Sequence, residues 1–149
     1  MKQAPKPVQE KDNAWKDVLN QFFREFMEFF FAHIAADIDW QRGYEFLDKE
    51  LEQITRDHRI GRRLADKLVK VWLRDGREQW LLIHLEVQCA LRRGFAKRIY
   101  IYNYRIFDKY DAEVISLVLL TEGRSPARQM LWQLGRWDCE LVFRFPVVS

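Results

Sequence analysis

The sequence predicts a single α/β domain in which helices flank a central β-sheet. Two runs of strand-forming residues, 64–73 and 79–88, stand on either side of a glycine turn and predict a hairpin. Two stretches with apolar residues at three- and four-residue spacing, 14–32 and 94–110, predict amphipathic helices. A chain of 149 residues is long enough for one sizeable core and too short for two.

The first helix is expected over residues 14–32, where large apolar side chains recur on one face. Asp12 or Asn13 can cap its N-terminus. The apolar positions are Trp15, Val18, Leu19, Phe22, Phe26, Phe29 and Phe30, and the stripe is broadened by Phe23, Met27 and Phe31. The other positions carry charges of both signs, which favours a helix packed on a sheet over one that lies on a membrane surface.

Three further segments follow the second helix. The continuous apolar run 114–121 suits a buried strand. Residues 122–129 contain glycine and proline and predict a loop. Residues 139–148 alternate and predict a last strand, in which Pro146 favours a position at the edge of the sheet or at the end of the strand.

The hairpin carries carboxylates on both strands, and its register decides whether they meet. A two-residue turn at Asp75 and Gly76 would set Asp66 opposite Leu85, so that Asp66 and Glu86 would face opposite sides. A loop with an odd number of residues sets Asp66 directly opposite Glu86, with their Cβ atoms about 5 Å apart. The second register is the hypothesis that a structure can test.

If the carboxylates meet, they predict a divalent metal site. Two ionised carboxylates so close repel each other unless one takes up a proton or a cation lies between them. Mg²⁺ prefers such oxygen ligands and completes its coordination with water and substrate phosphate, and Mn²⁺ is the alternative. His84 and Gln88 share the face of Glu86 because strand side chains alternate. A lone histidine is more often structural than catalytic, so His84 is expected as an accessory residue beside the site.

Four segments, taken in order, resemble one family of nucleases. They are DNAWK at 12–16, RLADKLV at 63–69, HLEVQ at 84–88, and RIYIY followed by NYR at 98–105. Their order and spacing are similar to those of the recombination-promoting nuclease and YhgA-like transposase family, a branch of the PD-(D/E)XK nuclease superfamily. The resemblance covers most of the chain from Asp12 to about Asp111.

The resemblance implies a restriction-endonuclease-like domain over residues 12–149, with a mixed central sheet and Mg²⁺-dependent activity on DNA. Asp66 and Glu86 would be the metal ligands. Gln88 would stand where the superfamily usually has lysine. Because glutamine is neutral, the metal and other basic groups would have to stabilise more of the charge that develops on the phosphate. Lys70, on the same strand face as Asp66, is a candidate substitute for that lysine.

The same resemblance implies accessory and DNA-binding residues. Asp12 would supply a further acidic group and Lys16 would meet phosphate. Arg98 and Tyr102 lie at helical spacing and would share a face toward the DNA backbone. Apart from the resemblance, Arg63 belongs to a basic run just before the hairpin that could follow DNA, although such a run is usually a solvated face. By analogy with the nuclease fold, a first strand is expected at residues 50–55, although the sequence from 45 to 55 is rich in helix formers.

Charge and cysteine content limit the setting of the protein. A net charge of +3 permits nucleic-acid binding through a local patch without requiring it. Two cysteines without zinc-site spacing indicate free thiols in a reducing compartment. Residues 1–11 are polar and are expected to form a disordered lead, and no uncharged run is long enough to span a bilayer. We therefore expect a cytoplasmic protein without a membrane partner.

Two alternatives to a nuclease remain open at this point. One is a non-catalytic descendant that binds DNA or protein, consistent with Gln88 and with a chain that ends at Ser149 directly after a strand pattern, as a C-terminally truncated copy would. The other is an interaction domain that forms a homodimer through the phenylalanine-rich first helix.

Overall fold

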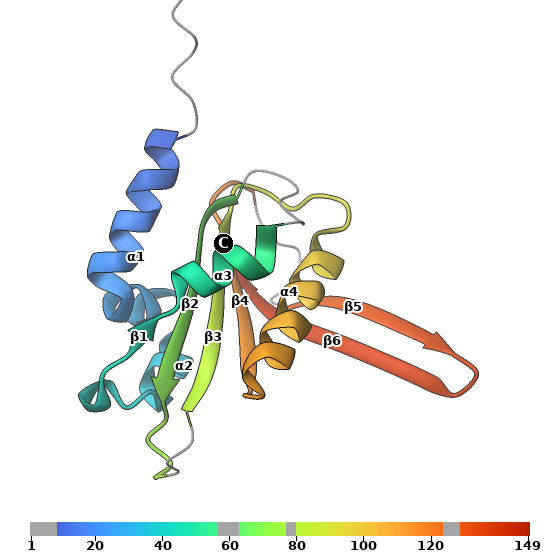
Figure 1. The fold of residues 1–149 in the computed structure, drawn as a ribbon. Coiled ribbons are helices and arrows are strands. Elements are labelled where there is room, and N and C mark those ends of the chain that lie inside the picture. Colours follow the sequence, from blue (N-terminus) through green and yellow to red (C-terminus); the bar gives the residue numbers. More distant parts are fainter. Residues whose placement is uncertain (1–8, 57–62, 77–79, 124–128) are drawn as a thin grey trace, which may run out of the picture.

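The computed structural model describes residues 9–56, 63–76, 80–123 and 129–149 (Figure 1). They form a single α/β domain with a six-stranded mixed sheet, in the strand order β1-β2-β3-β4-β6-β5. The strands are β1 (Glu45–Phe46), β2 (Arg63–Trp72), β3 (Trp80–Gln88), β4 (Val114–Leu120), β5 (Gln129–Arg136) and β6 (Cys139–Val148). The helices are α1 (Gln9–Phe30), α2 (Ala32–Asp37), α3 (Asp48–Thr55) and α4 (Phe95–Tyr110), with a 3₁₀ turn, η1, at Trp40–Arg42. The predicted α/β class and the central sheet flanked by helices are confirmed.

The antiparallel hairpin of β2 and β3 has the register that an odd-numbered loop requires. Asp66 pairs with Glu86, and at the far end of the hairpin Trp72 pairs with Trp80. Gly76 lies in the connecting loop with φ +78°, a left-handed conformation that glycine adopts without steric cost. The predicted pairing of Asp66 with Glu86 is therefore confirmed, whereas residues 77–79 of the loop lie outside the described part.

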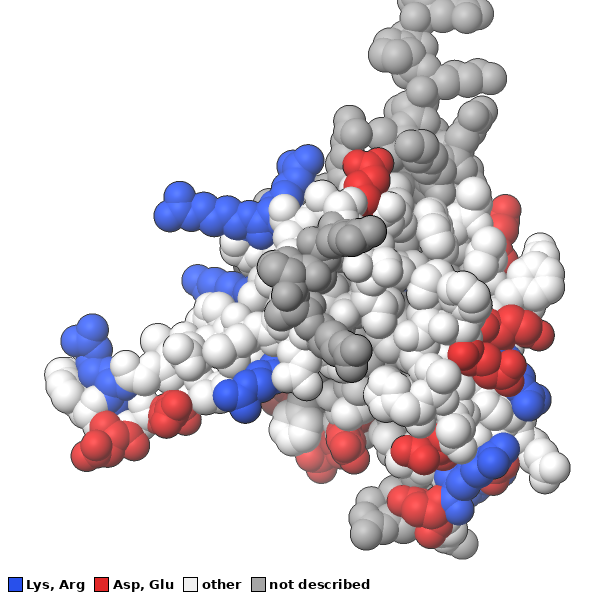
Figure 2. Space-filling view, turned by 180° about the vertical axis from the view of Figure 1, so that it is seen from behind, with Lys and Arg blue, Asp and Glu red and all other residues white. Residues whose placement is uncertain are grey.

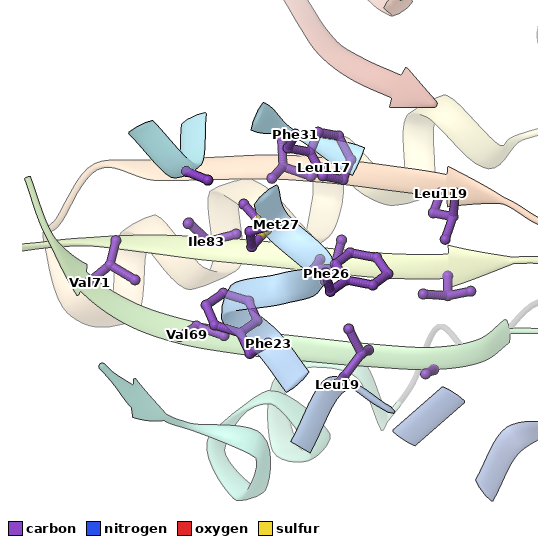
Figure 3. Close-up of a cluster of buried hydrophobic side chains, with 14 of the residues drawn as sticks. Leu19, Phe23, Phe26, Met27, Phe31, Val69, Val71, Ile83, Leu117 and Leu119 are labelled. Carbon is purple, nitrogen blue, oxygen red and sulfur yellow. The ribbon is translucent and has the colours of Figure 1, made fainter. Parts of the chain in front are cut away.

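One face of the sheet is covered by α1 and α2 and holds the larger core (Figure 3). Side chains from α1, from the α1–α2 junction and from strands β2 to β4 interdigitate there. Those labelled in the figure are Leu19, Phe23, Phe26, Met27, Phe31, Val69, Val71, Ile83, Leu117 and Leu119. The prediction of a helix packed on a sheet is confirmed, although α1 begins at Gln9 and ends at Phe30. Among the described residues, no helix combines the length and the apolar character needed to cross a lipid bilayer.

The opposite face of the sheet is covered by α3 and α4. Leu51 of α3 and Ile106 of α4 pack with Leu68 and Leu82. Because side chains alternate along a strand, Leu68 and Leu82 share their face with Asp66 and Glu86. Both carboxylates therefore project toward the α4 side of the sheet, away from the larger core.

The expected strand at residues 50–55 is wrong. These residues lie in α3, and the first strand is the two-residue β1, which pairs with Val69 and Lys70 of β2. Asp48 and Glu50 stand in the first turn of α3, where acidic side chains interact favourably with the helix dipole. Residues 48–55 form a helix, as their helix-forming composition favours, and not the strand expected by analogy with the nuclease fold.

The last two strands form an antiparallel hairpin that extends beyond the helical layers, and we call it the arm (Figure 1). The strand expected at 139–148 is confirmed as β6. It lies between β4 and β5, so Pro146 is not on an edge strand; it stands just before Val147, where the pairing with β4 begins. The strand β5 was not expected from the sequence, although Met130, Trp132 and Leu134 alternate there with mostly non-apolar residues.

A buried lysine connects three elements, and this arrangement predicts a measurable stability effect. Lys67 Nζ donates hydrogen bonds to Asn20 Oδ1 of α1 and, at 2.5 Å, to Asp48 Oδ2 of α3. We expect Lys67→Met to lower the free energy of unfolding by about 1–3 kcal/mol, because two acceptors lose their donor. Lys109→Met, at an exposed position of α4, should cost less than about 0.5 kcal/mol. Urea denaturation compares the two, and equal losses would contradict the structural role of Lys67.

Candidate functional site

The candidate site lies where β2 and β3 carry their two opposed carboxylates. Glu86 is fully buried and Asp66 is half-buried. His84 and Gln88, also buried, share the face of Glu86 on β3. The structure thus brings four of the predicted residues onto one side of a single hairpin.

Helix α4 supplies a cation to this group. Arg98 is 8% exposed, and its Nη2 donates a hydrogen bond of 2.6 Å to Glu86 Oε1. The same Nη2 lies 3.4 Å from Gln88 Oε1, at the limit of a hydrogen bond. A carboxylate buried in a sheet is costly unless a charge or donors balance it. Arg98, predicted from the sequence as a DNA-binding residue, provides that balance inside the protein.

His84 belongs to a polar group on the β4 side of the carboxylate. Its Nδ1 lies 3.4 Å from Ser116 Oγ, and its Nε2 lies 3.9 Å from Glu86 Oε2. Asn103 Nδ2 of α4 donates to the same Ser116 Oγ at 3.0 Å. The ring of Tyr102 meets the imidazole edge-on, with centroids 5.9 Å apart. His84 is therefore held beside Glu86, in the accessory position that the sequence suggested.

Ser116 and Asn103 are site-lining residues that sequence reasoning missed. Ser116 interrupts an otherwise apolar strand and pairs with His84 across β3 and β4. A polar residue inside a buried strand was the available signal, because such a residue needs a hydrogen-bonding partner. Its partner on α4 could not be inferred before the packing of that helix was known.

Lys70 is not brought to the carboxylates. Its Nζ lies 4.5 Å from the ring centroid of Trp80 and 5.2 Å from that of Trp72, at the other end of the hairpin. Four residues of strand separate Lys70 from Asp66, which corresponds to about 13 Å. A cation–π contact with two tryptophans accounts for its position.

The remaining predicted residues lie away from the pair or outside the described side chains. Lys16 is exposed on α1, the helix that covers the opposite face of the sheet. Asp12 belongs to the first turns of α1, where the structure does not describe the side chains. Arg63 pairs through its backbone with Gln88 at the start of β2, and its side chain is likewise outside the described part.

A small basic cavity adjoins the site at the N-terminus of α4. It has a volume of about 60 Å³ and is lined by Arg92, Arg93, Gly94, Phe95 and Arg98. No side chain caps this end of α4, and its first turn has no acidic residue. Helix N-termini attract anions because backbone N–H groups and the helix dipole point toward them. Arg98 lines this cavity and also contacts Glu86, so it links the basic cavity to the carboxylate.

The donor set suits a cation that keeps much of its water. Within the described residues, no cluster of three or more histidine, cysteine, aspartate or glutamate side chains could hold a metal ion. Asp66 and Glu86 nevertheless provide opposed carboxylates on neighbouring strands. Mg²⁺ is commonly bound by one or two carboxylates together with water and substrate phosphate. Asp66 and Glu86 are therefore of the ligand type that Mg²⁺ and Mn²⁺ prefer.

Comparisons with family models, with curated proteins and with solved structures found no match to this chain.

Proposed function

We propose that this domain is an endonuclease that hydrolyses DNA phosphodiester bonds with Mg²⁺, or with Mn²⁺, and that its fold is restriction-endonuclease-like. The observation that carries the proposal is the pairing of Asp66 with Glu86 on the face where Arg98 lies. The resemblance of the sequence to the recombination-promoting nuclease family supports the same reaction. By that resemblance, the biological setting would be recombination or the processing of mobile-element DNA.

Each residue of the site has a role in this proposal. Asp66 and Glu86 would hold the cation through their carboxylate oxygens, and Gln88 would orient water or phosphate through its neutral amide. When bound, Mg²⁺ supplies a water of lowered pKa and neutralises charge on the scissile phosphate. Because Gln88 is uncharged, a neighbouring cation has to balance the charge that develops on the phosphate. Arg98 contacts both Glu86 and Gln88 and is suited to that task.

The basic cavity gives the DNA backbone a place beside the carboxylates. Arg92 and Arg93 are exposed and line this cavity together with the buried Arg98. Arginine and helix N-termini both bind phosphate oxygens, and such contacts position DNA without reading its sequence. A phosphate seated there would approach Glu86 from the side of α4.

A specific observation also favours a second candidate, a nuclease fold that binds DNA or protein without cutting. Arg98 already balances the charge of Glu86, so Glu86 does not require a metal for its burial. By the resemblance, Gln88 would stand where the superfamily usually has lysine. A cation would have to compete with the Arg98 guanidinium for Glu86, and a protein in which the guanidinium prevails would be inactive.

The deciding experiment incubates supercoiled plasmid with the protein in Mg²⁺, in Mn²⁺ and in chelator. We expect nicking that depends on the divalent cation and that falls by at least about 100-fold in Asp66→Ala, since part of the charge-stabilising site is removed. Asp108→Ala, at an exposed position of α4, is the matched control and should nick like the unmodified protein. Gel electrophoresis of the plasmid forms measures the rate.

Two outcomes would contradict an enzymatic role. DNA that is bound in a gel-shift assay and remains intact in both metals supports the non-catalytic module. Nicking of equal rate in Asp66→Ala and in the unmodified protein would place the activity elsewhere or in a contaminant.

A further inference from the structure

The arm has one face that no other element of the described structure covers. On this face, which we call the free face, strand alternation and the β5–β6 register place Leu131, Gln133, Gly135, Glu140, Val142 and Arg144. All of them are exposed. The other face of the arm packs against α4 near the body of the domain, where Trp132 stacks on Tyr100 with ring centroids 4.5 Å apart. Toward the tip of the arm, Leu134 and Leu141 on that face are exposed.

The free face combines exposed apolar side chains with charges of both signs. Leu131 is 42% exposed and Val142 is 41% exposed. Glu140 and Arg144 lie on β6 on either side of Val142, two residues away in each direction. Figure 2 shows the arm projecting from the body with acidic and basic side chains near its end and uncharged surface between them.

This order of residues is self-complementary under a twofold rotation. If two free faces meet with β6 antiparallel to the β6 of a second copy and Val142 at the centre, Glu140 of each copy faces Arg144 of the other. On β5 the same rotation is centred on Gln133, because Gln133 pairs with Val142. It sets Leu131 of each copy against Gly135 of the other.

The residues that would meet on β5 also match in size, because the large side chain of Leu131 faces a glycine, Gly135. A Cβ atom added at Gly135 would meet no atom closer than 3.8 Å, so the surface there is open. Leu131 of a second copy therefore has space at the position where the first copy lacks a side chain.

We propose that the free face of the arm binds the free face of a second copy of this chain, giving an isologous dimer. The charge order Glu140, Val142, Arg144 selects a second copy because one twofold rotation satisfies both charges and places Val142 of one copy against Val142 of the other. This interface differs from the α1 surface considered from the sequence, and it holds whether or not the domain cuts DNA.

Charge reversal and charge exchange test the proposal in the full chain. Glu140→Arg sets arginine against arginine at both symmetric contacts, and Arg144→Glu sets glutamate against glutamate. We expect each single variant to weaken the dimer by roughly 10- to 30-fold, as two exposed ion pairs become repulsive. The double variant Glu140→Arg/Arg144→Glu restores opposite charges at both contacts and should dimerise like the unmodified protein. Sedimentation equilibrium over a range of concentrations measures the dissociation constant.

Two further variants separate this face from general effects on the arm. Arg136→Glu makes the same charge change on the opposite face of the arm, and its dissociation constant should be unchanged. Gly135→Val fills the space proposed for Leu131 of the second copy while favouring strand structure, so the arm should fold and the dimer should weaken. A protein that is monomeric at all concentrations overturns the proposal. So does a dimer that is equally strong in Glu140→Arg, because its interface must then lie elsewhere.

Discussion

Replacing Arg98 by methionine is expected to lower the free energy of unfolding by about 3–5 kcal/mol, which is the usual cost of leaving one member of a buried ion pair without its partner. Arg98 is 8% exposed and Glu86 is fully buried, with 2.6 Å between Nη2 and Oε1. The loss arises mainly from the Glu86 carboxylate, which cannot be hydrated at its position in β3. Guanidinium denaturation of the two proteins measures it.

The chain contains a matched control for this prediction. Arg24 and Glu28 form an ion pair of nearly the same length, 2.7 Å, but both side chains are about half exposed. Arg24 also lies over the Trp40 ring, 5.4 Å from its centroid. Arg24→Met should therefore cost no more than about 1 kcal/mol. If Arg24→Met and Arg98→Met lower the free energy of unfolding equally, then burial of the Glu86–Arg98 pair does not raise its contribution to stability.

A double variant separates the charge from the packing. In Glu86→Leu/Arg98→Met both members of the pair become apolar, and buried pairs replaced in this way are often no less stable. We expect the double variant to regain most of the stability that Arg98→Met loses. It should not cleave DNA, because a proposed metal ligand is gone. Stability that stays low in the double variant would indicate that Arg98 acts mainly through packing, for example through its guanidinium over the Phe95 ring at 5.1 Å.

Phe23→Ala is expected to have an effect of similar size on the opposite side of the sheet. Phe23 is fully buried, and its ring contacts three other aromatic rings at centroid distances of 5.1–5.9 Å. These rings belong to Trp40, Tyr44 and Phe46, so one side chain connects α1 to η1 and β1. Truncation of a buried phenylalanine leaves a cavity and typically costs about 3–5 kcal/mol.

Phe29 on the same helix provides the comparison. It is 80% exposed, so Phe29→Ala should change the free energy of unfolding by no more than about 0.5 kcal/mol. Urea denaturation of both variants tests whether α1 packs on the sheet with the face described here. Equal effects of the two substitutions would mean that α1 is rotated or only loosely attached.

Much of the site could be predicted from the sequence because it depends on local pattern. Strand alternation placed His84, Glu86 and Gln88 on one face, and the turn around Gly76 allowed the register that opposes Asp66 and Glu86. Lys70 was expected to help the carboxylates because it shares a strand face with Asp66. Distance along the strand and the two neighbouring tryptophans give it a different environment.

The sequence by itself determined the α/β class, the central hairpin, the two amphipathic helices and the strands β4 and β6, because hydrophobic periodicity and turn residues act over a few positions. It left two registers open for the hairpin, and the structure decided between them. Only the tertiary structure decided that α4 packs on β3, which gives Glu86 its partner Arg98 and joins Asn103 to Ser116 beside His84. The exposure of the free face of the arm likewise depends on tertiary structure, because it is set by which faces of the strands are covered by helices. Such contacts join residues that are distant in the chain, and no local periodicity records which buried charge will meet which cation.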